Sequence, residues 1–160
     1  IYRLFTCMFL HFGIYHIANN MLVLFVLGQR LEPVVGKIKF ILIYLLGGLG
    51  GNIFSFIMEM KSADYAVSAG ASGAVFAVMG AMLYVVIRNH GRIQDISVRQ
   101  MMIMAGFSLY FGFTSTGVDN AAHVGGMVCG FILAAVFYHP GNFSGRTMWK
   151  DVSPSDSISA

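Results

Sequence analysis

Charged residues are scarce in this sequence. Only 11% of its 160 residues are Asp, Glu, Lys or Arg, whereas a soluble domain usually carries about a quarter. A soluble globular domain is therefore a poor fit. The net charge of +3 comes from basic residues in the short segments between apolar runs, and it gives no signal for nucleic-acid binding.

Cysteine is almost absent too. The two cysteines, Cys7 and Cys129, stand near opposite ends of the chain, which indicates neither a disulfide framework nor a metal-binding cluster. We therefore expect no metal ion and no cofactor.

Hydrophobic residues dominate the composition instead. They make up 57% of the chain, and the mean hydropathy is +0.73. Nearly uncharged segments of roughly 17 to 22 residues recur, each long enough to cross the ~30 Å hydrocarbon core of a bilayer. The pattern predicts an all-α polytopic membrane protein, with Pro33 ending its first helix. The expected helices are residues 16–27, 39–58, 72–87, 101–115 and 121–138, between an interfacial segment, 1–15, and a polar tail, 140–160.

The basic residues predict how these helices cross the membrane. Three basic residues and one acidic residue lie in each of the segments 28–39 and 88–99, whereas segments 59–69 and 116–120 are net acidic. The positive-inside rule assigns the first two segments to the cytoplasmic face. The first, third and fifth helices then all begin at the outer face, so polar residues in their opening turns share one slice of the membrane. These residues are His16, Asn20, Ser72 and His123.

Two of these polar residues could form a nucleophile and its base. Polar side chains inside a membrane span are costly and point to function by default. Glycines beside Ser72 permit a sharp turn that leaves its hydroxyl accessible, although they also fit a simple helix-packing face. His123 could be an interfacial histidine bonded to a carbonyl, but its depth matches that of Ser72. We therefore favour a Ser–His pair.

The other polar residues have simpler readings. Asn20 follows His16 by four residues and shares its helix face. His11 lies about 140° around any continuous helix from His16, so a structural hydrogen bond fits it better than a metal site. Asp119 could orient His123, but a helix N-cap at Asp119 or Asn120 is simpler. Arg3 fits a loop anchor, and Arg30 with Glu32 fits a helix-end pair or cap.

Small residues form a stripe on each helix that would carry the pair. The third helix has Gly73, Ala77 and Gly80 on one face, and the fifth has Gly126, Gly130 and Ala134. Such stripes let helices approach closely in membranes. We expect the two stripes to face each other.

Five short motifs occur in a recognisable order and spacing. They are Tyr2-Arg3, His11-x4-His16-x3-Asn20, Gly28-x-Arg30-Leu31-Glu32, Gly70-Ala71-Ser72-Gly73 and Ala122-His123-Val124-Gly125-Gly126. In these motifs the chain resembles the rhomboid intramembrane serine proteases. The resemblance implies a rhomboid-like helical bundle, of which this chain carries five transmembrane helices of a six-helix core and lacks the first. Residues 1–139 would form the protease domain.

The resemblance also implies a role for each matching residue. Ser72 would be the nucleophile and His123 the general base of a dyad. His16, Asn20 and the backbone N–H of Ser72 would form the oxyanion hole. Phe76 would stack on the imidazole, at a position where many members carry tyrosine. Structural positions of the family match Arg3, His11 and Glu32.

The predicted activity is that of an intramembrane serine endopeptidase. Its partners would be the lipid bilayer and proteins with transmembrane helices, cleaved near the outer face, with no nucleic acid. We expect a multi-pass protein of a bacterial cell membrane with its active site toward the outer face and tail 140–160 in the cytoplasm. The alternative is a catalytically inactive rhomboid-like protein that binds transmembrane helices. A channel or transporter fits less well, because paired intramembrane charges and repeated halves are not found.

Overall fold

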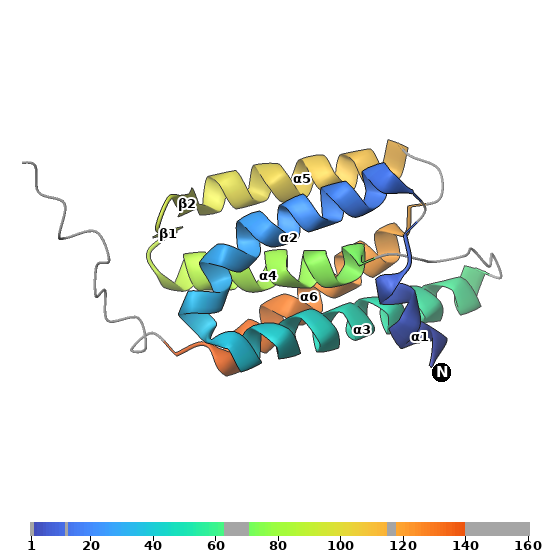
Figure 1. Cartoon of the computed structure of the whole chain (residues 1–160), viewed down its shortest axis with the longest axis horizontal. Coiled ribbons are helices and arrows are strands. Elements are labelled where there is room, and N and C mark those ends of the chain that lie inside the picture. The colour runs from blue at the N-terminus through green and yellow to red at the C-terminus, as the bar shows by residue number, and fades with distance from the viewer. Residues whose placement is uncertain (1, 12, 63–70, 115–117, 140–160) are drawn as a thin grey trace, which may run out of the picture.

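The computed structural model describes residues 2–11, 13–62, 71–114 and 118–139, and its long helices form a bundle (Figure 1). A short N-terminal pair of helices leads into this bundle, and a small hairpin interrupts it. The elements are α1 (Arg3–Thr6), the 3-10 helix η1 (Cys7–Phe9), α2 (Ile14–Val35), α3 (Lys37–Ser62), α4 (Ser72–Arg88), β1 (Arg92–Ile93), β2 (Ile96–Ser97), α5 (Val98–Thr114) and α6 (Asn120–Phe137).

The expected all-α class is correct apart from one hairpin. Strands β1 and β2 pair antiparallel, with Arg92 opposite Ser97 and Ile93 opposite Ile96. Gln94, in the turn between them, has a left-handed backbone with φ 51°. The hairpin lies within segment 88–99, which the sequence suggested only as a connecting loop.

Helix α2 is longer than the sequence predicted. It continues through Pro33 to Val35 and ends at Gly36, whose φ is 90°. Pro33 lacks an N–H and therefore costs the helix one backbone hydrogen bond. Val34 and Val35 beyond it are each only 6% exposed, and this burial offsets the loss. The prediction that Pro33 ends the helix is wrong; the other four helices begin and end within four residues of the expected positions.

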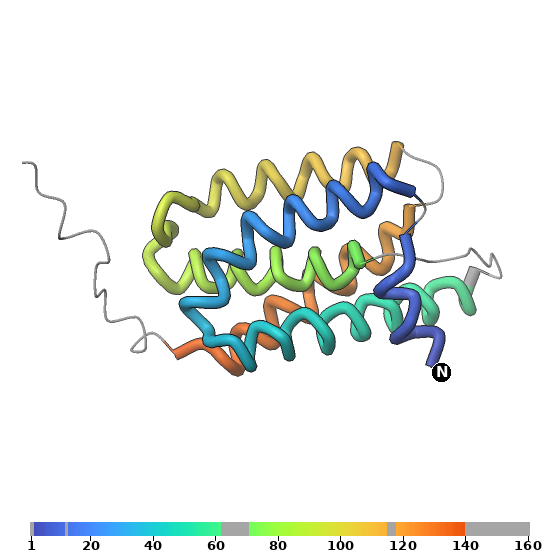
Figure 2. Tube along the Cα trace, viewed as in Figure 1, coloured from blue at the N-terminus to red at the C-terminus, as the bar shows by residue number. Residues whose placement is uncertain are grey.

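Helix α4 occupies the centre of the bundle (Figure 2). It runs between α2 on one side and α3 with α6 on the other. Twelve of its residues are buried, from Gly73 to Val86. Because α2, α4 and α6 all begin at the same end of the bundle (Figure 1), residues in their opening turns lie in one slice, as the sequence indicated.

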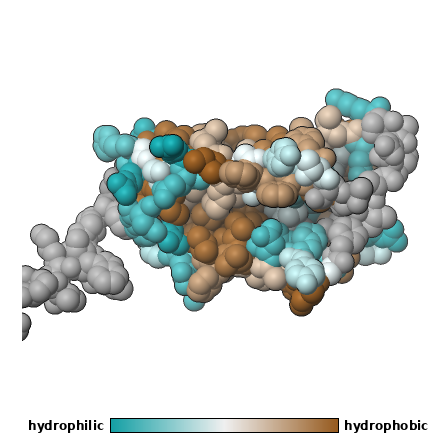
Figure 3. Space-filling model, turned by 90° about the horizontal axis from the view of Figure 1, so that it is seen from above, coloured by the Kyte–Doolittle hydropathy of each residue, from teal (hydrophilic) through white to brown (hydrophobic). Residues whose placement is uncertain are grey.

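The surface of the bundle is largely hydrophobic. Hydrophobic residues gather across the middle of the face seen in Figure 3, and hydrophilic residues lie toward its ends. Two described helices are long and apolar enough to cross a membrane, Lys37–Lys61 and Asn120–Phe137. A third span results if the bent pair Arg3–Phe9 and Ile14–Val35 is counted as one. Length and composition therefore account for two or three of the five expected spans; α4 and α5, with 17 residues each, are too short to be counted.

Candidate active site

Helices α4 and α6 cross backbone to backbone. A Cβ atom added at Gly126 would collide with the carbonyl oxygen of Gly73, and one at Gly130 with that of Ala77. In the other direction, a Cβ atom at Gly80 would collide with the carbonyl oxygen of Met127. The predicted contact between the two small-residue stripes is therefore confirmed.

His123 lies near the N-terminal end of α6, in the first turn of the helix. Its side chain is 5% exposed, and its imidazole stacks on the ring of Phe76, with centroids 4.3 Å apart and planes 9° from parallel. Phe76 follows Ser72 by four residues, which is about one turn of α4. The imidazole therefore packs against the turn of α4 that begins at Ser72.

The Ser72 hydroxyl and the imidazole are close in the fold but not hydrogen-bonded. Among the hydrogen bonds of the described residues, none joins Ser72 to His123, and the buried Nδ1 of His123 has no partner there. Ser72 itself is partly buried. Catalytic hydrogen bonds are often long or poorly aligned in the absence of substrate, so the lack of this bond does not exclude a Ser–His pair.

Asn20 brings an unused donor to the same end of the bundle. It lies in the second turn of α2, is 5% exposed, and its Nδ2 atom has no hydrogen-bond partner among the described residues. A buried amide N–H without a partner is costly. A ligand atom that accepts from Nδ2 would remove that cost, which is the property required of an oxyanion-hole donor.

His11 and His16 meet edge to face. Their ring centroids are 5.4 Å apart at 71°. The sequence analysis placed the two side chains about 140° apart on the assumption of one continuous helix. That assumption is wrong, because α2 begins only at Ile14, after an extended Gly13. The buried Nε2 of His11 has no partner in the described part of the chain, so that nitrogen does not make the expected structural hydrogen bond. No group of three or more metal-ligating side chains occurs among the described residues, and two imidazoles alone do not support a metal site.

Unsatisfied polar atoms concentrate at this end of the bundle. Buried polar groups usually have a partner, either protein or water. Among the described residues, the buried polar atoms that lack a hydrogen-bond partner belong to residues just before α2 or in the first turns of α2 and α6. A cluster of this kind can be satisfied by water or by a polar ligand. The atoms are Nε2 of His11, Nδ2 of Asn20, Oδ1 of Asn120 and Nδ1 of His123.

Asp119 caps α6. Its Oδ1 accepts a hydrogen bond from the backbone N–H of Ala122 at 2.8 Å, so the N-cap prediction for Asp119 is confirmed. The Ser55 hydroxyl donates to the other oxygen, Oδ2, at 2.6 Å. Ser55 was not recognised from the sequence, although a polar residue in an apolar 26-residue helix could have drawn attention to it.

Asn52 is a second polar residue of α3 that the sequence analysis missed. It is 5% exposed, and its Nδ2 donates to the carbonyl oxygen of Leu4 at 2.7 Å and to Sγ of Cys7 at 3.2 Å. These bonds tie the short N-terminal helices to the middle of the bundle. Like Ser55, it interrupts an otherwise apolar run.

The expected partner of Arg30 is wrong. Its guanidinium makes a two-pronged ion pair with Asp95 in the β1–β2 turn, with N–O distances of 2.6 and 2.8 Å, and not with Glu32. These hydrogen bonds lower the pKa of the Asp95 carboxyl to about 2. The partners lie 65 positions apart in the sequence, so only the tertiary fold brings them together. Arg3 is exposed and its side chain makes no hydrogen bond to the described residues; its anchoring role stays a prediction.

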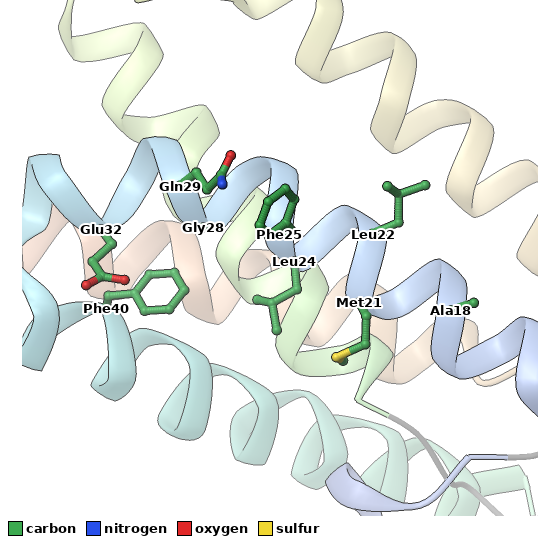
Figure 4. Close-up of a pocket in the computed structure, with 9 residues that line it drawn as sticks. All are labelled: Ala18, Met21, Leu22, Leu24, Phe25, Gly28, Gln29, Glu32 and Phe40. Atoms are coloured by element: carbon green, nitrogen blue, oxygen red, sulfur yellow. The ribbon is translucent and has the colours of Figure 1, made fainter.

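Glu32 lies at the end of an apolar groove along α2. The groove has a volume of about 720 Å³ and reaches Phe40 of α3 (Figure 4). Apart from Glu32 and Gln29, its walls are apolar or glycine. None of Ser72, Phe76 and His123 lines it, so it is separate from the candidate active site.

Comparison with known proteins identifies the family. Residues 1–140 match the model of the Rhomboid domain. The chain belongs to the rhomboid family. Membership makes it a polytopic helical membrane protein, in line with its apolar surface and span-length helices.

Several rhomboid relatives are similar over most of this chain. It is 38% identical to Rhomboid protease GluP of Bacillus subtilis (strain 168) over 139 residues, 87% of this chain and 26% of that protein. It is 36% identical to RHOMBOID-like protein 1 of Arabidopsis thaliana, over 86% of this chain and 34% of that protein. RHOMBOID-like protein 2 of the same plant is 40% identical, over 84% and 42% respectively. The chain therefore spans less than half the length of these relatives.

Some residues of the rhomboid motifs fall outside the described part of the structure. They include Gly70, in the segment 63–70 that precedes the candidate nucleophile. The polar tail, 140–160, lies outside it as well, as does the segment 115–117 before α6. The predictions made for these residues stay predictions.

Proposed function

We propose that this chain carries the catalytic dyad of an intramembrane serine endopeptidase, with Ser72 as nucleophile and His123 as general base. The observation that supports it most is the stacking of the His123 imidazole on Phe76, at 4.3 Å and one turn from Ser72. Serine acylation requires a base within reach of the nucleophile, and this stacking holds the imidazole against the turn of α4 that begins at Ser72. The identity to a Bacillus protein named a rhomboid protease also supports the proposal.

The chemistry follows from these side chains. His123 accepts the Ser72 hydroxyl proton as the oxygen attacks a peptide carbonyl, and it then protonates the leaving amine. In the second half of the reaction, His123 accepts a proton from water as the water attacks the acyl-enzyme. It then returns that proton to the Ser72 oxygen as the acyl group leaves. Because the α4 helix begins at Ser72, its free N–H groups and dipole favour the oxyanion that forms.

The oxyanion would also need side-chain donors. Asn20 supplies a buried Nδ2 without a partner in the described residues, and His16 lies one turn earlier on the same helix. Loss of one such donor in serine hydrolases lowers kcat about 10²–10³-fold. We therefore assign both residues to the oxyanion hole.

The membrane setting completes the proposal. Five spans of this chain would sit in a bilayer, with the polar end of α2, α4 and α6 at the outer face and segment 88–99 in the cytoplasm. The substrate would be a transmembrane helix that unwinds locally near that face. Small or helix-breaking residues near its cleavage site would reduce the cost of unwinding.

The test is cleavage of a model transmembrane substrate by the full-length protein purified in detergent. Ser72→Ala and His123→Ala should each reduce cleavage to background, and the double variant should be no worse than either. Ser108→Ala, a partly buried serine of α5, is the matched control and should cut at the native rate. Substantial cleavage by Ser72→Ala would rule out the dyad. Tight substrate binding without cleavage by the native protein would indicate the inactive, helix-binding alternative.

Variants of the supporting residues separate catalysis from stability. Asn20→Ala and His16→Ala should lower kcat more than they weaken substrate binding, because these donors act mainly in the transition state. His11→Ala should act mainly through a lower melting temperature. If both Asn20→Ala and His16→Ala cut at the native rate, the oxyanion-hole assignment is wrong.

A further inference from the structure

Helix α3 carries two buried polar residues that the proposed chemistry does not use. Asn52 and Ser55 are 5% and 3% exposed, and they lie three residues apart on one helix face. Ser55 points its hydroxyl at Asp119, at the start of α6, with an Oγ–Oδ2 distance of 2.6 Å. An oxygen–oxygen distance this short is typical of a charge-assisted hydrogen bond.

Asp119 in turn holds the first turn of α6. Its Oδ1 accepts from the N–H of Ala122 at 2.8 Å, and its backbone carbonyl accepts from the N–H of His123 at 3.2 Å. One oxygen of the carboxylate thus accepts a hydrogen bond from α6, and the other accepts one from α3. Since His123 lies in the turn that this cap closes, the position of Asp119 bears directly on the position of the imidazole.

We propose that Ser55 is a positioning residue for His123, acting through Asp119. The hydroxyl fixes the rotamer of the capping carboxylate, so the cap cannot rotate away from the Ala122 N–H. A helix end that loses its cap frays. Fraying of this turn shifts the imidazole relative to Ser72, and a displacement near 1 Å can cost about 10²-fold in rate.

Close packing of α3 against α6 explains why Ser55 can reach the Asp119 carboxylate. A Cβ atom added at Gly51 of α3 would lie 2.6 Å from the carbonyl oxygen of Ala122 and 2.9 Å from the backbone N of Gly126. Helix α3 therefore touches the α6 backbone one turn before Ser55. That contact places Ser55 level with Asp119, within hydrogen-bond distance of its carboxylate.

The experiment measures both the order of the turn and the catalytic rate in the full-length protein. Hydrogen exchange reports the amides of Ala122 and His123, which donate to Asp119, and cleavage of a transmembrane substrate gives kcat and KM. Ser55→Ala should speed exchange of these amides and lower kcat, each about five- to tenfold, with KM unchanged. Ser55→Thr, which keeps the hydroxyl, should restore both values, and Ser108→Ala on α5 should change neither.

Non-additivity tests the route through Asp119. Because Ser55 acts through the carboxylate, Ser55→Ala should add nothing to the loss already caused by Asp119→Ala. If Ser55→Ala does not fold, Asp119→Asn carries the test, because it keeps an oxygen acceptor for the Ala122 N–H and removes the charged acceptor of the Ser55 hydroxyl. Asp119→Asn should then show the same rise in exchange and the same fall in kcat at unchanged KM.

Each remaining outcome counts against the proposal or against the proposed function on which its catalytic part rests. Unchanged exchange in Ser55→Ala overturns the proposal, as does faster exchange at native kcat. An equal fall in kcat for Ser108→Ala would show a general effect on the fold and would also overturn it. If the native protein cleaves no substrate, the proposed function fails, while exchange still decides whether Ser55 and Asp119 order the turn.

Discussion

Helices α5 and α6 both pack beside α4, but they are held in different ways. Helix α6 meets α4 through glycines, and an added Cβ at Gly126 or Gly130 would collide with the α4 backbone. Helix α5 buries only Met101, Ala105 and Gly112, and a Cβ atom added at its Gly106 would meet nothing within 4 Å.

We call the α4–α6 contact the precise interface and the α4–α5 contact the permissive one. Where two backbones touch, the distance between helices is set by main-chain atoms, which cannot change rotamer. Where long side chains fill the gap, they can repack at small cost. The proposed nucleophile and base lie on the two helices of the precise interface. The proposed reaction would thus take place where the fold tolerates the least displacement.

Substitution of glycines should break this contrast most strongly. Gly126→Ala inserts a methyl group against the Gly73 carbonyl and pushes α6 away from α4, so we expect activity to fall at least about 10²-fold. Gly80→Leu should have the same effect from the α4 side. Gly106→Ala on α5 is the matched control and should retain native cleavage and native melting temperature. Native activity in Gly126→Ala would show that the close crossing is not required.

Aromatic residues on the two interfaces should show a smaller contrast. Phe76 is 5% exposed and Phe107 of α5 is 60% exposed. Phe76→Ala leaves a cavity beside the imidazole, so we expect a loss of about 3 kcal/mol in stability and a lower kcat. Phe107→Ala should change stability by less than about 0.5 kcal/mol. Denaturation in detergent, together with kcat, measures both; equal losses for the two variants would contradict the comparison.

The ion pair that ties α2 to the hairpin before α5 should have the smallest effect. Arg30 keeps the pKa of Asp95 at about 2 in the folded protein, below its value of about 4 in an unfolded chain. The pair therefore stabilises the fold above about pH 4, and this contribution disappears as the pH falls toward 2. Because the Asp95 side chain is 64% exposed, water screens the interaction, and we expect at most about 1 kcal/mol.

Melting temperature against pH measures this contribution. Asp95→Asn should melt slightly below the native protein at pH 7, and the gap should close between about pH 4 and pH 2. Cleavage at pH 7 should be close to native, since α5 is the permissive neighbour. A gap that stays constant down to pH 2 would show that the charge of Asp95 is not what stabilises the contact.

The errors of the sequence analysis share a physical origin. Pro33 was expected to end a helix because local rules penalise it, but burial of Val34 and Val35 outweighs one lost hydrogen bond. Arg30 was paired with its neighbour Glu32, whereas its partner Asp95 is brought near by the hairpin. In both cases a contact distant in sequence overrides a local preference. Patterns within one helix carry no information about such contacts.

The helical class, the extents of most helices and the facing stripes of α4 and α6 followed from the sequence alone. They depend on apolar run length and on residue size at fixed helical spacing, which are local properties. The stacking of His123 on Phe76, with ring centroids 4.3 Å apart, was expected only through the resemblance to the rhomboid proteases. The tertiary structure alone revealed the hydrogen bonds that link Ser55 through Asp119 to the first turn of α6. These contacts depend on the rotation and height of each helix against its neighbours. Packing of the whole bundle sets both, and no segment specifies them by itself.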